Sequence, residues 1–309
     1  MTAGSRAFIH VDRSALRTDA MIRLAIRIVC FSMPALAAFA PTVLVTSALA
    51  QAPAGPELRN PKLSIDYVEP RSAEFQDLYE RLKKRQVLEE LAQFLSPLKL
   101  PLSLRLKFAE CGVVNADYDP LDLRIRICYE WVDFMEKRAP TAAVPAAGLV
   151  SRADAIVGST VSVILHEMGH ALFDILKVPV LGKEEDAADQ IAGFIMLQFG
   201  KETARRLITG TAFMYFVQSK VDGNSNFSDT HGTDLQRFYN YLCIAYGREP
   251  ETFADFVAKN ILPTSRAENC AREYRQVQRA YMQLINPFVD QEMMKKVQAI
   301  DWLKPRDKR

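Results

Sequence analysis

The chain has 309 residues, of which about half are hydrophobic, and this is enough for a sizeable core in one large domain or two small ones. The formal net charge of +2 is small. Such a charge gives no electrostatic reason to expect nucleic acid as a partner, and we predict none.

The first fifty residues differ in character from the rest. A long uncharged run follows Arg27 and ends in Ala48-Leu49-Ala50, a small-x-small pattern of the kind that signal peptidase cuts. We therefore expect residues 1–50 to be a signal peptide that is cleaved after Ala50. The stretch MIRLAIR makes a better basic leader than the residues before it, so we expect the true start at Met21.

An uncleaved membrane anchor is the alternative, because the same run is long enough to span a bilayer. Two prolines, Pro34 and Pro41, interrupt the run and favour cleavage. Removal of residues 1–50 takes away five basic and two acidic residues and leaves a net charge of about −1. The expected product is periplasmic or secreted and has no stable membrane span.

Four cysteines remain after this cleavage, and an even number in an exported protein suggests two disulfides. Four cysteines allow three pairings. We expect the pairs that are nearest in sequence, Cys111 with Cys128 and Cys243 with Cys270. A zinc site made of all four cysteines would need close C-x-x-C pairs, which the sequence lacks.

The rest of the chain predicts one α+β domain. Residues 51–61 are proline-rich and predict a flexible lead-in. Residues 62–309 form the domain, with a sheet-containing part at 62–138 and a helical part at 149–309. The expected architecture is a small N-terminal sheet with one helix against it, followed by a mostly α-helical half.

Hydrophobic patterns place the elements of the first part. LSIDYVEP and LSLRLKFAE alternate as strands do, and LRIRICYE alternates again after the turn-rich NADYDPLD. Between the first two strands, residues 72–95 repeat apolar side chains at spacings of three and four, which predicts one amphipathic helix. An exposed strand edge can bind peptide through main-chain hydrogen bonds, and LRIRIC is the candidate for such an edge.

The second part is predicted to be helical. An Ala/Pro-rich loop at residues 139–148 precedes it, and a polar loop is expected at 221–232. Periodicity and helix-ending residues predict helices at 159–177, 184–199, 202–220, 233–246, 252–260 and 266–284. The chain has no glycine-rich phosphate loop and no G-x-S-x-G motif.

The chemistry centres on LHEMGHALFD, which contains an H-E-x-x-H motif. On a helix, His166 and His170 lie one turn apart on the same face and can take two corners of a zinc tetrahedron. Glu167 lies beside them as the candidate general base for the attacking water. Two histidines bonded within the core would be the plainer explanation, but a buried helix must find partners for their ring nitrogens, and zinc supplies them.

A third ligand is expected from the downstream stretch GKEEDAADQ. Glu185 and Asp189 are four residues apart and share one helix face. Catalytic zinc often takes two histidines and a glutamate, and a ligating histidine usually donates its other N–H to a carboxylate. Glu185 is therefore the candidate ligand, and Asp189 the candidate partner of a histidine. Glu184 and His231 remain alternatives to Glu185 as the third ligand.

His231, in the stretch DTHGTDLQRFYN, is the candidate for stabilising the oxyanion that forms when water attacks a carbonyl. Tyr239 could serve instead. A solvent-exposed loop histidine with no role in chemistry is the alternative for His231.

H-E-M-G-H followed by E-D-A-A-D resembles the gluzincin group of zinc peptidases. The mature chain also resembles a bacterial family of metallopeptidase-like proteins without an assigned function, domain of unknown function 4344. The stretches that carry this resemblance are CGVVNADYDP, ICYE, HEMGHALFD, EDAADQ, HGTDLQRFYN and ENCAREY. The resemblance implies zinc, a zincin-like fold and proteolysis, but it implies no particular substrate.

These observations together predict an exported zinc-dependent metallopeptidase that hydrolyses peptide bonds of a peptide or protein substrate. In this hypothesis His166, His170 and Glu185 bind Zn²⁺, and Glu167 and His231 are the catalytic residues. The rival hypothesis is a secreted binding or scaffold protein in which zinc only stabilises the fold. A fourth protein ligand such as His231 would favour the rival, because structural zinc sites are closed by four protein ligands.

Overall fold

The computed structural model describes residues 58–140, 150–221 and 228–304, and the structural statements below concern these residues. The predicted signal peptide, its start at Met21 and most of the predicted lead-in lie outside the described residues. Most of the predicted Ala/Pro loop and part of the predicted polar loop lie outside them as well.

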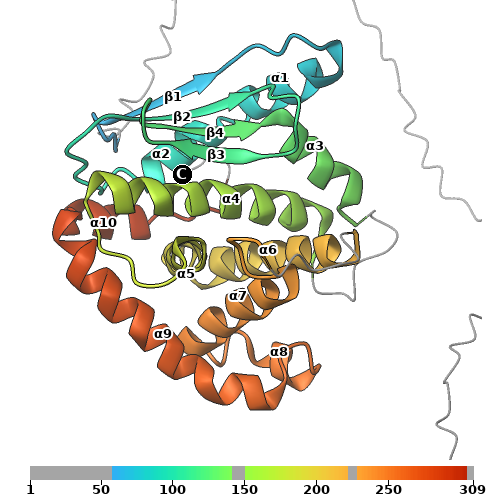
Figure 1. The fold of residues 1–309 in the computed structure, drawn as a ribbon, viewed down its shortest axis with the longest axis vertical. Helices are drawn as coiled ribbons and strands as arrows, with labels where there is room; N and C mark the ends of the chain where they lie inside the picture. Colours follow the sequence, from blue (N-terminus) through green and yellow to red (C-terminus); the bar gives the residue numbers. More distant parts are fainter. Residues whose placement is uncertain (1–57, 141–149, 222–227, 305–309) are drawn as a thin grey trace, which may run out of the picture. The chain divides into compact units, whose positions relative to one another are not determined.

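A four-stranded mixed sheet forms the first part of the domain (Figure 1). The strands are β1 (Leu63–Tyr67), β2 (Leu104–Ala109), β3 (Ala116–Asp119) and β4 (Arg124–Cys128). Their order in the sheet is β1-β2-β4-β3. The first three of these are parallel, and β3 is antiparallel to β4 at the edge. The α+β class predicted from the sequence is therefore confirmed.

Strand β3 corrects two predictions. It lies within NADYDPLD, which we predicted to be turns, and its pairing turns the predicted edge strand LRIRIC into an interior strand. The aspartates that suggested turns are instead cross-strand partners of arginines, with Arg126 Nη2 2.8 Å from Asp117 Oδ1 and Arg124 Nη2 2.8 Å from Asp119 Oδ2. Such pairs stabilise neighbouring strands. On this side of the sheet the edge strand is β3, so a further strand would have to pair with β3 and not with β4.

The single helix predicted at residues 72–95 is wrong, because the chain forms α1 (Gln76–Lys84) and α2 (Val87–Phe94). The break lies at Gln86, whose φ of 54° is in the left-handed region. Four polar residues, KKRQ, occupy positions 83–86 and interrupt the apolar stripe. No apolar face therefore continues from α1 into α2, so burial does not favour one unbroken helix through Gln86.

The second part is helical, as predicted, with boundaries that differ by a few residues. Helices α3 and α10 and a short 3₁₀ turn at each end of the domain were not predicted as elements. The helices after β4 are α3 (Tyr129–Arg138), α4 (Arg152–Ile175), α5 (Glu184–Met196), α6 (Lys201–Val221), α7 (Asp234–Arg248), α8 (Ala254–Ala258), α9 (Thr264–Leu284) and α10 (Gln291–Gln298).

Helix α4 is the centre of the domain and lies between the sheet and helices α5 and α6 (Figure 1). It begins seven residues before the predicted start, because the Ser151 side chain accepts a hydrogen bond from the Asp154 N–H and caps the helix. Gly158 lets α6 approach closely, since a Cβ there would come within 2.6 Å of the Leu207 carbonyl oxygen. Helix α4 is long and apolar enough to cross a membrane, but most of it is buried within this domain. These features are those of a core helix.

Two disulfides are present, Cys111–Cys128 and Cys243–Cys270, which is the pairing expected from the sequence. The first joins the loop after β2 to the end of β4, and the second joins α7 to α9. Each would stabilise the fold by about 3 kcal/mol, chiefly by restricting the unfolded chain. Disulfides of this kind are typical of an oxidising compartment outside the cytosol.

Candidate metal centre

Two adjacent helices bring the predicted site residues together. Helix α4 carries His166, Glu167 and His170, and α5, which packs against it, carries Glu185 and Asp189. The chain turns back between them at Gly182, whose positive φ of 95° suits glycine. Residues that are fifteen or more positions apart therefore face one another across the contact of the two helices.

Three donor atoms converge on one point. His166 Nε2 lies 3.0 Å from Glu185 Oε2 and 3.2 Å from His170 Nε2, and His170 Nε2 lies 3.3 Å from Glu185 Oε2. Ligand atoms that are 2.0–2.1 Å from a tetrahedral zinc ion would lie about 3.3–3.4 Å from one another. The three atoms are therefore close to the spacing of three corners of such a site, and an expansion of the cluster by a few tenths of an ångström would admit the ion.

The remaining ring nitrogen of each histidine bonds to a carboxylate. His166 Nδ1 lies 2.9 Å from Asp189 Oδ1, and His170 Nδ1 lies 2.7 Å from Glu184 Oε1. An ionised carboxylate only accepts hydrogen bonds, so each Nδ1 carries a proton and donates it. This leaves the two Nε2 atoms as the ring nitrogens that could face a metal ion. Glu184, an alternative third ligand, is bonded to the far side of His170 and is half-exposed.

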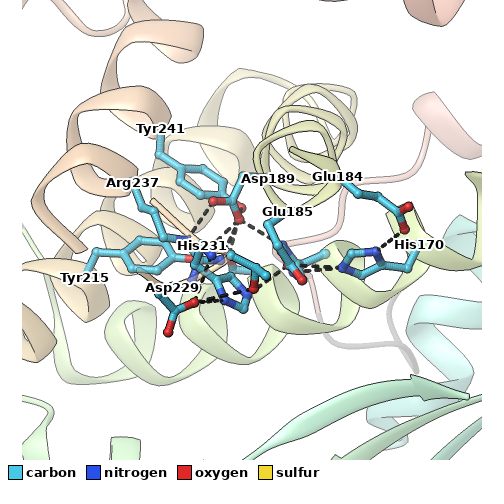
Figure 2. A network of polar contacts seen from close by, with 12 residues as sticks. His170, Glu184, Glu185, Asp189, Tyr215, Asp229, His231, Arg237 and Tyr241 are labelled. Carbon is cyan, nitrogen blue, oxygen red and sulfur yellow. Dashed lines mark hydrogen bonds and ion pairs between the residues drawn. The ribbon is translucent and has the colours of Figure 1, made fainter. Parts of the chain in front are cut away.

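Asp189 is buried at the centre of a polar network (Figure 2). The guanidinium of Arg237 donates two hydrogen bonds of 2.7 Å to its carboxylate, one to each oxygen. The hydroxyls of Tyr241 and Tyr215 lie 3.3 and 3.4 Å from Oδ1. The Arg237 guanidinium also stands 4.4 Å above the Tyr215 ring, a cation–π contact. The network holds Asp189, and through it the His166 ring, in one orientation.

His231 approaches the same centre from the loop before α7. Its Nε2 lies 2.8 Å from Glu185 Oε2, and donor atoms of His166, Glu185 and His231 all lie within 4.8 Å of one another. Asp229 accepts hydrogen bonds from the His231 backbone N–H and from Nδ1, at 2.9 and 3.1 Å (Figure 2). The His231 side chain is 39% exposed, in contrast to the buried His166. Tyr239, the alternative to His231, packs against the core and is not part of the cleft wall.

These residues line a cleft of about 700 Å³ between α4 and the sheet edge. Strand β3 supplies one wall, and Tyr118 of that strand donates a hydrogen bond of 2.8 Å from its hydroxyl to Asp174 at the end of α4. Glu167 also lines the cleft, next to His166 on α4. The Tyr118–Asp174 hydrogen bond holds the edge strand against the end of α4.

The charges of the metal-free cluster are strongly perturbed. Burial disfavours the charged form of His166, but the hydrogen bonds to Asp189 and Glu185 outweigh it and raise its pKa to about 9. Hydrogen bonds from His166, His170 and His231 hold the pKa of Glu185 well below its usual range. Burial raises the pKa of Glu167, which makes it a better proton acceptor.

A family model described as "Putative metallopeptidase", domain of unknown function 4344, matches residues 67–285, which is more than half of the chain. The chain belongs to this family. No curated protein and no solved structure matches the chain. The metallopeptidase family suggests a metal ion, and His166, Glu185 and His231 form a group of donors that could hold one, with His170 Nε2 3.2 Å from His166 Nε2. A second group, Cys111, Cys128 and Glu130, could not, because both cysteines are in a disulfide and offer no thiolate.

The residues of α7 that bond to Asp189 in this metallopeptidase-family chain were not predicted from the sequence. Arg237 and Tyr241 come from α7, a region used in the sequence predictions for a helix at 233–246, for His231 and Tyr239 as oxyanion candidates and for the family resemblance. Their spacing of four residues places them on one helix face, which was a signal that they share a partner. The sequence could not show that this partner is Asp189, because α5 and α7 meet only in the folded domain.

The Asp189–Arg237 pair yields a first prediction. Replacing Asp189 with alanine leaves the Arg237 guanidinium, which is only 14% exposed, without its counter-charge. Breaking a buried pair in this way destabilises a fold by about 3–5 kcal/mol, and loss of a histidine-orienting carboxylate weakens metal binding about 10–100-fold. Urea unfolding of the metal-free protein and competitive metal titration measure the two effects.

The matched control is Asp186→Ala, which removes an exposed carboxylate from the same helix. We expect a change in the free energy of unfolding within about 0.5 kcal/mol for this variant. Equal losses for the two variants would show that Asp189 has no special role.

Proposed function

We propose that this chain is an exported zinc-dependent metallopeptidase of the gluzincin type with a zincin-like fold. One observation carries the proposal: His166, His170 and Glu185 place three donor atoms 3.0–3.3 Å apart, beside the half-buried Glu167, in a cleft walled by a sheet edge. A metal-binding cluster that served only to join helices would need no cleft and no glutamate in its wall.

Zinc suits this donor set. Two imidazole nitrogens and one carboxylate oxygen are ligands of catalytic zinc, and each histidine already donates its other N–H to a carboxylate. When bound, zinc acts as a Lewis acid that lowers the pKa of water and polarises a substrate carbonyl. His166, His170 and Glu185 would hold it, with Asp189 and Glu184 fixing the two rings.

Glu167 is the general base. Its carboxylate faces the cleft next to the two histidines, and its raised pKa favours uptake of the proton from the attacking water. The same carboxylic acid then donates this proton to the leaving amine.

Strand β3 is the expected platform for the substrate main chain. It is the edge of the sheet on the cleft side, and an extended peptide can add to such an edge through main-chain hydrogen bonds. His231 stands across the cluster from the helix pair and is the candidate for stabilising the oxyanion. Arg237 forms an ion pair with Asp189, and through this carboxylate it fixes the orientation of the His166 ring.

A non-catalytic zinc protein is the second candidate. The observation in its favour is the short distance of 2.8 Å between His231 Nε2 and Glu185, which would allow His231 to act as a fourth ligand. Structural zinc is enclosed by four protein ligands, whereas catalytic zinc keeps one position for water. Metal binding by the variants described in the Discussion distinguishes the two candidates.

Metal removal and restoration test the proposed function. Purified protein should contain about one zinc ion per chain and should cleave members of a library of unstructured peptides. Treatment with a chelator should abolish this cleavage, and addition of one equivalent of zinc should restore it. Library fragments are read by mass spectrometry. Persistent cleavage by the metal-free protein, or no cleavage of any library member by the zinc-loaded protein, would refute the proposal.

Zinc binding should depend on pH with a definite sign. Zinc needs His166 in its neutral form, and the pKa of this residue in the metal-free chain is raised from 6.5 to about 9. Protons therefore compete with zinc below pH 9, and affinity should rise by up to tenfold per pH unit for each proton released between about pH 6.5 and 9. Competitive titration at several pH values measures this slope, and a flat profile would contradict it.

A further inference from the structure

A second cavity in the domain is separate from the metal cleft. It has a volume of about 240 Å³ and is lined by residues of α1, α2, α3, α4 and α6 together with Trp302. No described residue lines both this cavity and the metal cleft. Helix α4 contributes to both, with residues between 156 and 161 here and residues between 163 and 174 at the cleft. We call this second cavity the apolar groove.

The walls of the apolar groove are mostly aliphatic. Leu82, Leu91, Val132 and Leu207 are buried side chains that line it. Val157 of α4 also lines the groove, and it is 49% exposed although most of this helix is buried. Covering open apolar surface of this kind is favourable, and such surface often marks a binding site. The groove therefore suits an occupant that is apolar along most of its length.

One wall of the groove is aromatic and fixed. Phe199 and Trp302 line it, and their rings meet edge to face with a centroid separation of 5.6 Å. Phe94 stacks on Phe199 and meets the Trp302 ring edge-on, so a third ring holds both in place. A wall that is already ordered loses little conformational freedom when a ligand binds. The aromatic wall is therefore preformed for an apolar chain.

Four charged residues line the groove, and three of them have partners. Arg81 and Glu136 bind each other through two hydrogen bonds of 2.6 and 2.9 Å. Glu90 has a partner as well. The Arg85 side chain is exposed and forms no hydrogen bond or ion pair with any other residue that the structure describes. The uncompensated charge at the groove is therefore the Arg85 guanidinium, which suits an anionic group.

We propose that the apolar groove binds one free fatty acid, with its aliphatic chain along the apolar walls and its carboxylate at Arg85. Each methylene group that the walls cover strengthens binding about fourfold. A guanidinium can bind a carboxylate through two parallel hydrogen bonds. The inference does not depend on the proposed peptidase function.

Other amphiphiles fit the groove less well. A phospholipid with two chains is too large, because the cavity of about 240 Å³ is already smaller than the range of about 300–1,000 Å³ for sites of drug-sized ligands. A cationic head group would meet the Arg85 guanidinium and would find no free carboxylate, since Glu136 and Glu90 have partners. The groove therefore selects one chain with an anionic end.

Calorimetric titration of the full chain with saturated fatty acids tests the proposal. The protein is kept metal-free, because a carboxylate could otherwise bind to zinc at the metal centre. From octanoate to dodecanoate, all below their critical micelle concentrations, one molecule should bind per chain and Kd should fall about fourfold per methylene group. Dodecyltrimethylammonium, which has the same chain and a cationic head, should bind roughly fivefold more weakly than dodecanoate.

Two variants locate the chain and the head group. Val157→Glu places a carboxylate in the groove at a half-exposed position, so it should abolish dodecanoate binding and keep the parent circular dichroism spectrum. Its matched control is Val113→Glu, the same change at a valine that is 56% exposed and lines neither cavity, and this variant should bind dodecanoate like the parent. Arg85→Gln should weaken dodecanoate binding about two- to fivefold without weakening that of dodecyltrimethylammonium.

Each contrary result overturns a defined part of the proposal. Dodecanoate binding by folded Val157→Glu with the affinity of the parent would exclude the groove as the site, and a Kd that does not change with chain length would exclude apolar burial. Equal affinity for the carboxylate and the ammonium amphiphile, or unchanged binding by Arg85→Gln, would overturn the role of Arg85. None of these results bears on peptide cleavage, and a failure of cleavage would leave the groove untouched.

Discussion

Replacing Glu167 with glutamine is expected to lower kcat/KM for peptide cleavage by about 10²–10⁴-fold while one zinc ion per chain remains bound. Glutamine has nearly the same shape and can still occupy the cleft wall next to His166 and His170. It cannot accept the proton of the attacking water or pass one to the leaving amine. The metal ligands are untouched, so the loss falls on the rate and not on metal content.

Two measurements make this prediction specific. Zinc content is determined on the same preparation that is assayed for cleavage, which separates loss of chemistry from loss of metal. Glu202→Gln, an exposed substitution at the start of α6, is the matched control and should leave kcat/KM unchanged. Full activity of a zinc-loaded Glu167→Gln protein would show that another group moves the proton.

Glu185→Ala should lose bound zinc, whereas His231→Ala should keep it. Glu185 supplies the oxygen that lies 3.0 and 3.3 Å from the two histidine Nε2 atoms, so its loss opens the three-donor cluster and should reduce bound zinc far below one ion per chain. His231→Ala should keep the zinc and lower kcat by about 10²–10³-fold, the usual effect of removing one oxyanion donor. Metal analysis after dialysis, together with peptide cleavage, measures both.

Each other pattern of metal loss has a definite meaning. Zinc lost from His231→Ala but kept by Glu185→Ala would move the third ligand from α5 to the loop before α7. Zinc lost from both variants would indicate four protein ligands, which is the arrangement of a structural site and would favour the non-catalytic candidate. Because His231 lies 2.8 Å from Glu185, metal content must be measured before either role is assigned by activity.

The predictions that failed concern long-range pairing. LRIRIC has the alternation of a strand, and it is one, but nothing in it shows whether one or two neighbours bind it. The four residues of β3 carry two aspartates and resemble a turn until Arg124 and Arg126 are placed opposite them. The break at Gln86 is the exception, because its cause is local: the polar residues KKRQ at 83–86 interrupt the apolar stripe.

The sequence by itself determined what depends on local periodicity. A helical repeat of 3.6 residues puts His166 above His170, and Glu185 above Asp189, whatever the rest of the chain does. The α+β class follows from alternation in the first part and helical spacing in the second. The expected disulfide partners follow from cysteine number and proximity in the chain.

Only the tertiary structure decided which of these local pieces meet. The contact of α4 with α5 brings Glu185 to both Nε2 atoms, and α7 brings Arg237 to Asp189. The edge position of β3 beside the cleft depends on the order of strands in the sheet. The physical reason is that periodicity is a property of neighbours along the chain, whereas a site is formed by side chains from segments whose contacts are set by burial of the whole core.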